Sequence, residues 1–387
     1  MAGASRRSPW MDTELDDLRD MAKTFFEKEV TPNVMRYIEN KQVDRDLWNK
    51  AGDQGLLCID VPEEYGGGGG NFAHEAVLIE EQAYAGDSSW GASLHTGIVA
   101  HYLLAYGTEE QKTYWLPKMA SGEVVGAIAM TEPGTGSDLQ SVKARAIRDG
   151  DEYVINGSKI FITNGGQADM VLTVVKTNPE EAAAGISLVI VPTDTPGFAR
   201  GKNLNKIGMK GQDTSELFYD NVRVPVSNLL GAEEGQGFVQ LMHQLPQERL
   251  IVAVSNVAAM EAIFEETMRY VHGRQAFGRS IWGFQNTKHR MAEVATDMRV
   301  ARSFLDECIG LHLKGELDIP TAAMVKLHCS EKAQQIADKC LQLHGGYGYM
   351  EEYPVARAWA DLRVSQIYAG TSEIMKEIIS RTLPAPS

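Results

Sequence analysis

The sequence predicts an α+β protein in three parts, and two patterns lead to that prediction. Apolar residues recur at helical spacing in the first third of the 387-residue chain and again from about residue 235, whereas the stretch between them reads as β-strands. These strands follow one another without helices between them, which favours an antiparallel barrel or sandwich over a Rossmann sheet. We therefore expect an N-terminal all-α domain over residues 1–121, a middle β domain over 122–230 and a C-terminal helical bundle over 231–387.

The N-terminal domain is predicted to be helical because its apolar residues form one face. Leu15, Leu18 and Phe25 belong to such a face, and Thr108 with Gln111 forms a capping box that begins a later helix. The expected helices cover residues 13–39, 46–54, 72–84 and 88–106.

The middle domain is predicted from short apolar and alternating runs that are separated by turn residues. Asp149-Gly150 and Asn156-Gly157 are typical of hairpin turns. Gly134-Thr135-Gly136 is not a dinucleotide fingerprint, because no βαβ unit surrounds it. The expected strands cover residues 124–130, 142–148, 152–155, 170–175, 187–191 and 216–224.

The C-terminal domain begins with a helical pattern that Pro246 interrupts. A proline inside a helix removes one backbone hydrogen bond and bends the helix. Glu248 and Arg249 follow directly, among apolar neighbours. A carboxyl group in an apolar wall has a raised pKa and can accept a proton near neutral pH, whereas a surface helix with solvated Glu and Arg is the simpler interpretation. A long helix over residues 321–343 is expected to end at Gly345-Gly346.

Composition excludes several classes of function. The net charge is -15 with a pI near 5.1, and no basic run is available for a nucleic acid. No apolar run approaches membrane-spanning length. The four cysteines lack CxxC spacing and read as reduced core thiols of a cytosolic protein, and His344 has no partners at metal-ligand spacing, so no metal site is expected. The Ser5–Ser8 opening lacks a signal peptide's apolar region, and the Pro-Ala-Pro-Ser end is no peroxisomal address.

Two turns in the β domain offer groups to a ligand. Thr131 and Ser137 lie in the run Thr-Glu-Pro-Gly-Thr-Gly-Ser-Asp at the end of a strand, where hydroxyls and backbone N–H groups are available. Phe161 and Thr163 lie on one face of a later strand end, which suits a flat heteroaromatic ring. An ordinary hydroxyl-rich turn and a core Phe explain these residues equally well.

Three further clusters lie in the helical domain. Cations and an aromatic side chain follow the first long helix, which suits the phosphates and base of a nucleotide, although a solvated helix end is the default. The other two are glycine-containing turns that allow backbone to approach a ligand. The residues singled out are Arg274, Phe277 and Gln285, then Gln342 and Gly346, then Ala369, Gly370 and Thr371.

These five motifs, in this order, resemble the acyl-CoA dehydrogenase family over nearly the whole chain. The resemblance implies a helical domain, a β domain and a four-helix bundle, with FAD as cofactor, an acyl-CoA substrate and a role in fatty acid β-oxidation. It also implies a homotetramer in the cytoplasm, or in the mitochondrial matrix of a eukaryote, that passes electrons to an electron-transferring flavoprotein.

The resemblance also implies a role for each residue. Thr131, Phe161 and Thr163 would contact the flavin, and Phe161 departs from the Trp that relatives usually carry there. Ser137, Arg249 and the Ala369–Gly370 turn would lie at the substrate. The pyrophosphate and adenosine of FAD would contact, partly across a subunit interface, Arg274, Phe277, Gln285, Gln342 and Gly346. Thr371 would also bind the cofactor.

One departure decides the catalytic base. Short- and medium-chain relatives place a Glu where this chain has Ala369, whereas long-chain and isovaleryl relatives place it on the kinked central helix. The chain thus looks like the long-chain type, with Glu248 as the base. The expected reaction removes the α-proton to Glu248 and the β-hydride to flavin N5, which yields a trans-2-enoyl-CoA.

Three alternatives stay open on the residues alone. A branched-chain dehydrogenase would use the same base with a shorter pocket, and a flavin oxidase of the same superfamily would pass electrons to oxygen. A catalytically silent CoA- or flavin-binding homologue would lack a base, which the intact Glu248 argues against.

Overall fold

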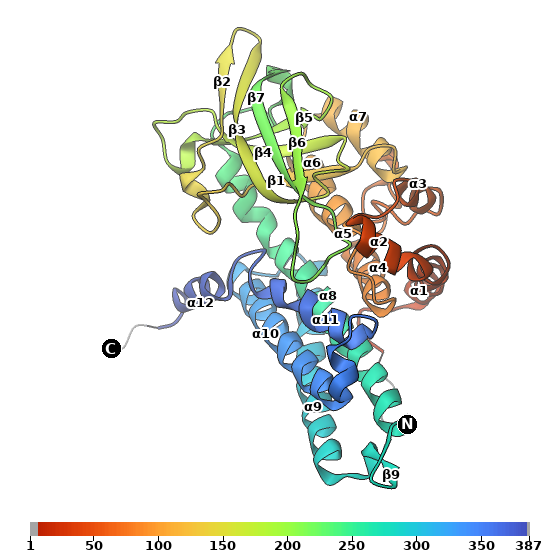
Figure 1. Cartoon of the computed structure of the whole chain (residues 1–387). Helices are drawn as coiled ribbons and strands as arrows, with labels where there is room; N and C mark the ends of the chain where they lie inside the picture. Colours follow the sequence, from red (N-terminus) through yellow and green to blue (C-terminus); the bar gives the residue numbers. More distant parts are fainter. Residues whose placement is uncertain (1–6, 385–387) are drawn as a thin grey trace.

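The computed structural model describes residues 7–384. The expectations about targeting rest on the Ser5–Ser8 opening and the Pro-Ala-Pro-Ser end, of which residues 5–6 and 385–387 lie outside the described residues. The β domain lies at one end of the molecule and the long helices at the other, with the N-terminal helices packed along the side of both (Figure 1). The predicted three-part α+β architecture is confirmed.

The N-terminal domain is helical, as predicted. Asp12, Asn71 and Thr108 accept hydrogen bonds from backbone N–H groups at the starts of three of its helices. The helices are α1 Thr13–Phe25, α2 Val34–Asn40, α3 Asp46–Asp53, α4 Phe72–Tyr84, α5 Ala92–Leu94, α6 His101–Tyr106 and α7 Glu109–Ala120.

Two of the predicted helices are wrong in detail. The predicted helix 13–39 is interrupted by a π-helical turn at Phe26–Val30 and a 3₁₀ turn at Thr31–Asn33. Pro32 has no N–H to donate, so one hydrogen bond of the helical ladder is missing at the 3₁₀ turn. The predicted helix 88–106 begins only at Ala92 and contains a π-helical turn at His95–Ala100.

The middle domain is a twisted, partly open sheet. Its strand order is β1-β4-β2-β3-β7-β6, and β5 pairs with β4. The strands are β1 Gly126–Ala129, β2 Arg145–Asp149, β3 Glu152–Thr163, β4 Met170–Lys176, β5 Ile186–Pro192, β6 Phe198–Asn203 and β7 Thr214–Pro225.

The prediction of a wholly antiparallel sheet requires correction. β4 pairs in parallel with both β1 and β2, whereas the β2–β3, β3–β7, β4–β5 and β6–β7 pairs are antiparallel. Strand spacing along a sequence does not reveal which strands become neighbours. The Asp149-Gly150 hairpin is present, but Asn156-Gly157 is a bulge inside β3 rather than a turn.

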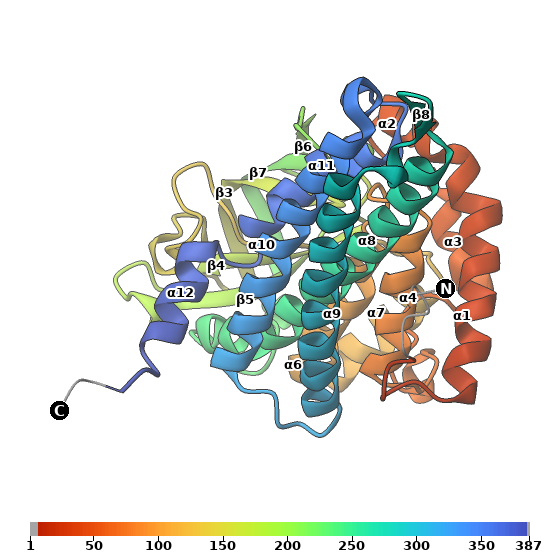
Figure 2. The same ribbon diagram turned by 90° about the horizontal axis from the view of Figure 1, so that it is seen from below.

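The C-terminal domain is a bundle in which α8, α9, α10 and α11 lie side by side, while α12 projects from it (Figure 2). Buried apolar side chains of α8, α9 and α10 share one core with residues of α4. A two-stranded hairpin, β8 Gln275–Ala276 and β9 Arg279–Ser280, lies at the end far from the β domain (Figure 1). The helices are α8 Gly237–Gly273, α9 Gln285–Leu313, α10 Ile319–His344, α11 Pro354–Leu362 and α12 Ser372–Ser380.

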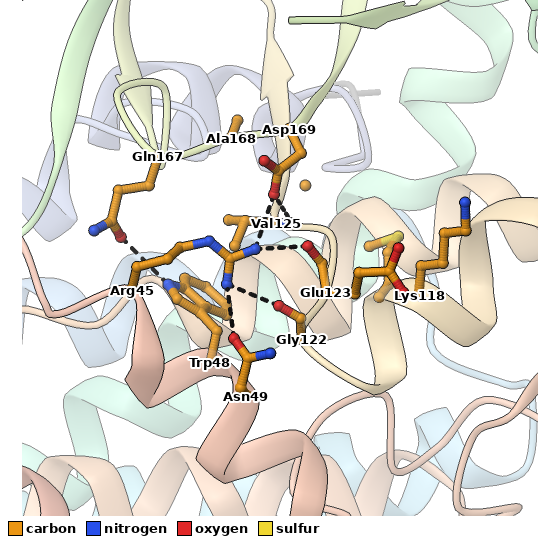
Figure 3. Close-up of polar contacts among 12 residues, drawn as sticks. Arg45, Trp48, Asn49, Lys118, Gly122, Glu123, Val125, Gln167, Ala168 and Asp169 are labelled. Atoms are coloured by element: carbon orange, nitrogen blue, oxygen red, sulfur yellow. Dashed lines mark hydrogen bonds and ion pairs between the residues drawn. The ribbon is translucent and has the colours of Figure 1, made fainter. Parts of the chain in front are cut away.

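An arginine joins the N-terminal domain to the β domain where one ends and the other begins. Arg45, on the turn before α3, donates to the carbonyls of Gly122 and Glu123 at 2.8 and 2.6 Å, and to Asp169 Oδ2 at 3.0 Å (Figure 3). Asp169 also accepts from the N–H of Val125. The predicted domain boundary at 121/122 falls at this junction, between α7 and β1.

A buried ionic network holds the helices together. Arg302 on α9 donates to both carboxylate oxygens of Glu261 on α8, at 2.9 and 2.6 Å, and to Glu80 on α4 at 2.5 Å. Arg19 on α1 binds Glu80 from the other side. The four helices are thus fixed relative to one another by paired charges.

None of the helices within residues 7–384 is both long and apolar enough to cross a membrane. The four cysteines are buried and none forms a disulfide.

Candidate active site

Glu248 lies inside the molecule on α8, which continues as one helix through Pro246. Its side chain is 6% exposed, and the Tyr102 hydroxyl of α6 donates to its Oε1 at 2.8 Å. Burial raises the pKa of Glu248 from 4.5 to about 7, and the Tyr102 hydrogen bond and the Arg249 charge limit the rise. The solvated-surface interpretation of this Glu is therefore excluded, and the carboxyl group can exchange a proton near neutral pH.

The helical turn that carries Glu248 is fixed by its neighbours. The amide of Gln247 donates to the Gly97 carbonyl at 2.8 Å, and its oxygen lies 3.1 Å from Nε2 of His312 on α9. A Cβ at Gly97 would lie 2.7 Å from Cδ1 of Ile251, so the absence of a side chain at Gly97 lets the π-helical turn pack closely against α8. Such turns are frequent at functional sites, and this one packs beside the candidate base.

The Ala369–Gly370 turn precedes α12. Both residues have left-handed backbone, with φ of 52° and 91°, and Thr371 caps α12 by accepting from the N–H of Ile374. Lys326 of α10 is fully buried and donates to the Gly370 carbonyl at 2.6 Å. Sequence reasoning missed Lys326, because one Lys in a long helix carries no signal of burial.

The Thr131–Asp138 run is held by a buried ion pair. Lys159 of β3 donates to Glu132 Oε1 at 2.9 Å and to the Met130 carbonyl at 3.0 Å, while the Ile160 N–H donates to the Thr131 carbonyl. Glu132 also accepts from the backbone N–H groups of Lys143 and Ala144, just before β2. The pair was not singled out from sequence, although Glu132 stands within the motif.

The β3 end provides an aromatic surface. Phe161 has φ of 62° and an exposed fraction of 63%, which is unusual for a large apolar residue in a strand, and the pairing of β3 with β7 is irregular there. Near the Thr131 turn, an added Cβ at Gly134 or Gly136 would meet no atom within 4 Å. An exposed ring beside open backbone and two threonines fits a flat heteroaromatic cofactor.

The residues expected at the nucleotide end of FAD lie in the C-terminal helical domain. Phe277 is 94% exposed with φ of 51°, and the Arg274 guanidinium lies 5.5 Å from the centre of the Tyr347 ring. Gln285 begins α9, and Gln342 and Gly346 lie at the end of α10. The β8–β9 hairpin and the β domain lie at opposite ends of the molecule (Figure 1). One protomer therefore separates the hairpin, with Phe277 between its strands, from the β domain.

Fold and site together define a class of protein, the flavin-dependent dehydrogenases of acyl thioesters. A helical domain, a β domain and a helical bundle surround a buried carboxyl group of raised pKa, and the β domain presents an exposed aromatic ring. The chain belongs to the acyl-CoA dehydrogenase family. It matches that family's N-terminal domain over residues 12–123, its middle domain over 127–222 and its C-terminal domain over 235–383.

Individual relatives agree with this assignment. The chain is 48% identical to the mitochondrial long-chain specific acyl-CoA dehydrogenase of Rattus norvegicus over 97% of its own length and 87% of the relative's. A crystal structure of an acyl-CoA dehydrogenase from Geobacillus kaustophilus is 46% identical, with a TM-score of 0.96 over 98% of this chain and 100% of the other. A glutaryl-CoA dehydrogenase from Mycobacterium smegmatis, solved with FADH2, is 28% identical, with a TM-score of 0.90 over 96% and 94%.

The protein is thus an FAD-dependent oxidoreductase that dehydrogenates acyl-CoA thioesters. The predicted family, enzyme class and cofactor are confirmed.

Proposed function

We propose that Glu248 is the catalytic base, which removes the α-proton of a medium- or long-chain acyl-CoA. The observation that carries this proposal is the position of Glu248: it is buried on α8, bonded to Tyr102, with a pKa of about 7. A carboxyl group with this pKa is ionised often enough to accept a proton and basic enough to hold it. The other position at which the family places the base is Ala369 in this chain. Alanine has no ionisable group, so Glu248 is the candidate that remains.

In the proposed reaction the α C–H bond breaks and its proton moves to a carboxylate oxygen of Glu248. FAD, when bound, supplies the acceptor for the hydride that leaves Cβ, and the carbon–carbon double bond forms between the two positions. Tyr102 orients the carboxylate, and an acyl chain that covers Glu248 excludes water from it.

The thioester needs polarisation because its α C–H is a weak acid. We assign the Ala369 N–H to the thioester oxygen, since this donor stands in a left-handed turn at the start of α12. Ser137 and Arg249 complete the substrate side. The cofactor side comprises Thr131, Phe161, Thr163 and Thr371 in one protomer, and Arg274, Phe277, Gln285, Gln342 and Gly346 at the nucleotide end.

The preference for straight medium or long chains is supported by the similarity to the rat long-chain enzyme. A branched substrate is the second candidate, because an isovaleryl-CoA dehydrogenase of Oryza sativa is 36% identical over 98% of this chain. The branched substrate ranks second because this identity is lower than the 48% shared with the rat long-chain enzyme.

An electron-transferring flavoprotein is the proposed electron acceptor, and a homotetramer is the proposed assembly. A solved chain described with the electron transferring flavoprotein of Acidaminococcus fermentans is 35% identical to this one, with a TM-score of 0.92. The mitochondrial relatives favour the matrix if the source is a eukaryote, and the cytoplasm is proposed otherwise.

Anaerobic titration with acyl-CoAs of graded length tests the substrate. Loss of flavin absorbance with long straight chains supports the proposal, whereas loss with isovaleryl-CoA alone supports the branched-chain enzyme. Rapid reoxidation by air after reduction would favour an oxidase. A bound flavin that no thioester reduces would contradict the proposed substrates.

Replacing Glu248 tests the base. Glu248→Gln keeps the shape of the side chain and removes its basicity, so we expect kcat to fall about 10²- to 10⁴-fold while FAD stays bound. Glu377→Gln, at an exposed carboxylate on α12, is the control. Full turnover in Glu248→Gln would refute the assignment.

A further inference from the structure

Lys326 is a buried cation that the reaction outlined above leaves without a role. Its side chain is fully enclosed on α10, and its ammonium donates to the Gly370 carbonyl at 2.6 Å. Burial and the nearby Arg249 lower its pKa to about 8, and Glu331 and Glu373 partly oppose this, so the ammonium form prevails at pH 7. Burying a cation costs free energy, so we expect the hydrogen bond from Lys326 to the Gly370 carbonyl to have a structural or functional role.

The Gly370 carbonyl belongs to a turn of unusual backbone. Ala369 and Gly370 both have positive φ, and Ala369 carries a Cβ that disfavours this conformation. Gly370 has a φ of 91°, a conformation that residues with a Cβ rarely adopt, so glycine is favoured at this position. Such a turn is held only where its surroundings fix it, and the bond from Lys326 is one such restraint.

The donors of the same turn are available to a ligand. Within residues 7–384, the N–H groups of Ala369 and Gly370 have no acceptor from the protein. Arg249 lies on the adjacent helix α8, and its Nε and one terminal nitrogen are buried without a hydrogen-bond partner in the described part of the chain. The Arg249 charge is close enough to lower the pKa of Lys326, whose ammonium is bonded to this turn. Unpaired donors and two positive charges thus lie in this region, which suits an oxygen that gains negative charge.

We propose that Lys326 is a positioning residue, which holds the Gly370 carbonyl so that the Ala369 N–H points at the thioester oxygen. This inference rests on the proposed function. Lys326 does not touch the substrate; it restrains a glycine whose peptide planes would otherwise rotate freely. Loss of this restraint weakens stabilisation of the enolate-like charge more than it weakens binding of the CoA portion.

The test uses FAD-loaded protein and two variants of Lys326. Lys326→Met removes the donor at similar length, and Lys326→Gln keeps a weaker, neutral donor. Lys332→Met is the control, because Lys332 also lies on α10 but pairs with Asp297 near the surface. We expect kcat with octanoyl-CoA to fall about 10- to 100-fold in Lys326→Met and less in Lys326→Gln, with KM changed by less than about threefold.

A second measurement separates positioning from folding. In 3-thiaoctanoyl-CoA sulfur replaces Cβ, so the ligand can lose its α-proton but has no β-hydride to give. Its enolate beside oxidised flavin is detected as long-wavelength absorbance. We expect the enolate fraction at fixed pH to fall in Lys326→Met and to recover in part in Lys326→Gln, while FAD content and melting temperature stay near those of the wild type.

Two results would overturn the inference. One is a wild-type enolate fraction and kcat in Lys326→Met; the other is a loss of activity in both variants that only follows loss of FAD or of folded protein. If Lys326→Met does not fold, a wild-type enolate fraction in Lys326→Gln overturns it and a reduced fraction with full FAD content supports it. Wild-type protein that neither forms the enolate nor is reduced by octanoyl-CoA would instead refute the proposed function.

Discussion

Tyr102 sets the proton affinity of Glu248. Its hydroxyl donates to the carboxylate, which lowers the pKa of Glu248 from the value that burial alone would give. Removing the hydroxyl in Tyr102→Phe therefore raises the pKa of Glu248. In the wild type, kcat/KM should rise with pH and level off above about 7, since the ionised carboxylate is the base.

In Tyr102→Phe we expect this rise to move to higher pH. The loss in kcat/KM should be about tenfold at pH 6 and much smaller at pH 9, where the carboxylate is ionised in both proteins. Tyr106→Phe is a matched control, because Tyr106 lies on the same helix and its hydroxyl contacts a backbone carbonyl rather than Glu248. A pH profile unchanged in Tyr102→Phe would contradict this role.

The same carboxyl group links stability to pH. Its pKa is raised from 4.5 to about 7 by folding, so the folded state binds more protons than the unfolded state between these values. The stabilisation is complete below pH 4.5 and is lost as pH rises through 7. Glu248→Gln cannot ionise, so it should be more stable than the wild type at pH 8, by at most about 3 kcal/mol.

Denaturant unfolding of the FAD-loaded proteins at pH 5 and pH 8 measures this effect. The difference between wild type and Glu248→Gln should be larger at pH 8. Equal differences at the two pH values would show that Glu248 keeps its ordinary proton affinity in the folded protein.

The candidate site could be predicted from sequence only in part. The position of Glu248 after Pro246 in an apolar helix drew attention to it, but only the family resemblance singled it out as the base. Phe161 was noted because it shares one face of a strand end with Thr163. Tyr102, Lys159 and Lys326 gave no signal: each contacts a residue at least 27 positions away along the chain, so their partners depend on packing between elements.

At the scale of elements, local patterns predicted the helices and most strands, but not how the strands pair. β4 lies between β1 and β2 although β2 and β3 precede it in the chain. β6 was missed because its residues Phe198–Asn203 are largely exposed and include Gly201. Alternation of apolar residues reports which face of a strand is buried, not which strand lies beside it.

The loop over residues 131–138 depends on one contact with β3. Lys159→Met would leave the buried Glu132 carboxylate without its cation, so we expect a loss of about 3–5 kcal/mol in the free energy of unfolding. The N–H of Ile160, the residue after Lys159, donates a hydrogen bond to the Thr131 carbonyl. Thr131 is a proposed FAD contact, so we expect FAD retention to fall as well.

Lys112→Met is the control for this variant, since Lys112 forms a surface pair with Glu109 and should contribute less than about 1 kcal/mol. Thermal denaturation and the ratio of FAD to protein measure both effects. A Lys159→Met protein as stable as the control, with full FAD content, would show that the loop is held by other contacts.

At the scale of the whole molecule, the far end of the bundle exposes large apolar side chains. Phe277 is 94% and Tyr349 85% exposed. Phe277 is three residues from Arg274 in the sequence, and Tyr347, two residues before Tyr349, lies under the Arg274 guanidinium. A contiguous exposed apolar patch marks an interaction site, and we expect these side chains to belong to a contact between protomers. A neighbouring protomer that covers them would also complete the nucleotide end of the FAD site, which one chain leaves remote from the β domain.

This arrangement predicts that assembly and cofactor retention fail together. Phe277→Ser with Tyr349→Ser should shift the protein from the proposed tetramer to smaller species and lower its FAD content, with the helical signal in circular dichroism unchanged. Met35→Ser, at an exposed apolar residue of α2, controls for a general loss of apolar surface. Light scattering after size exclusion, at graded protein concentration, gives the assembly state, and flavin absorbance gives the loading. Should the double variant remain a fully loaded tetramer, the subunit contact must lie on another face, and the nucleotide would have to be held within one chain.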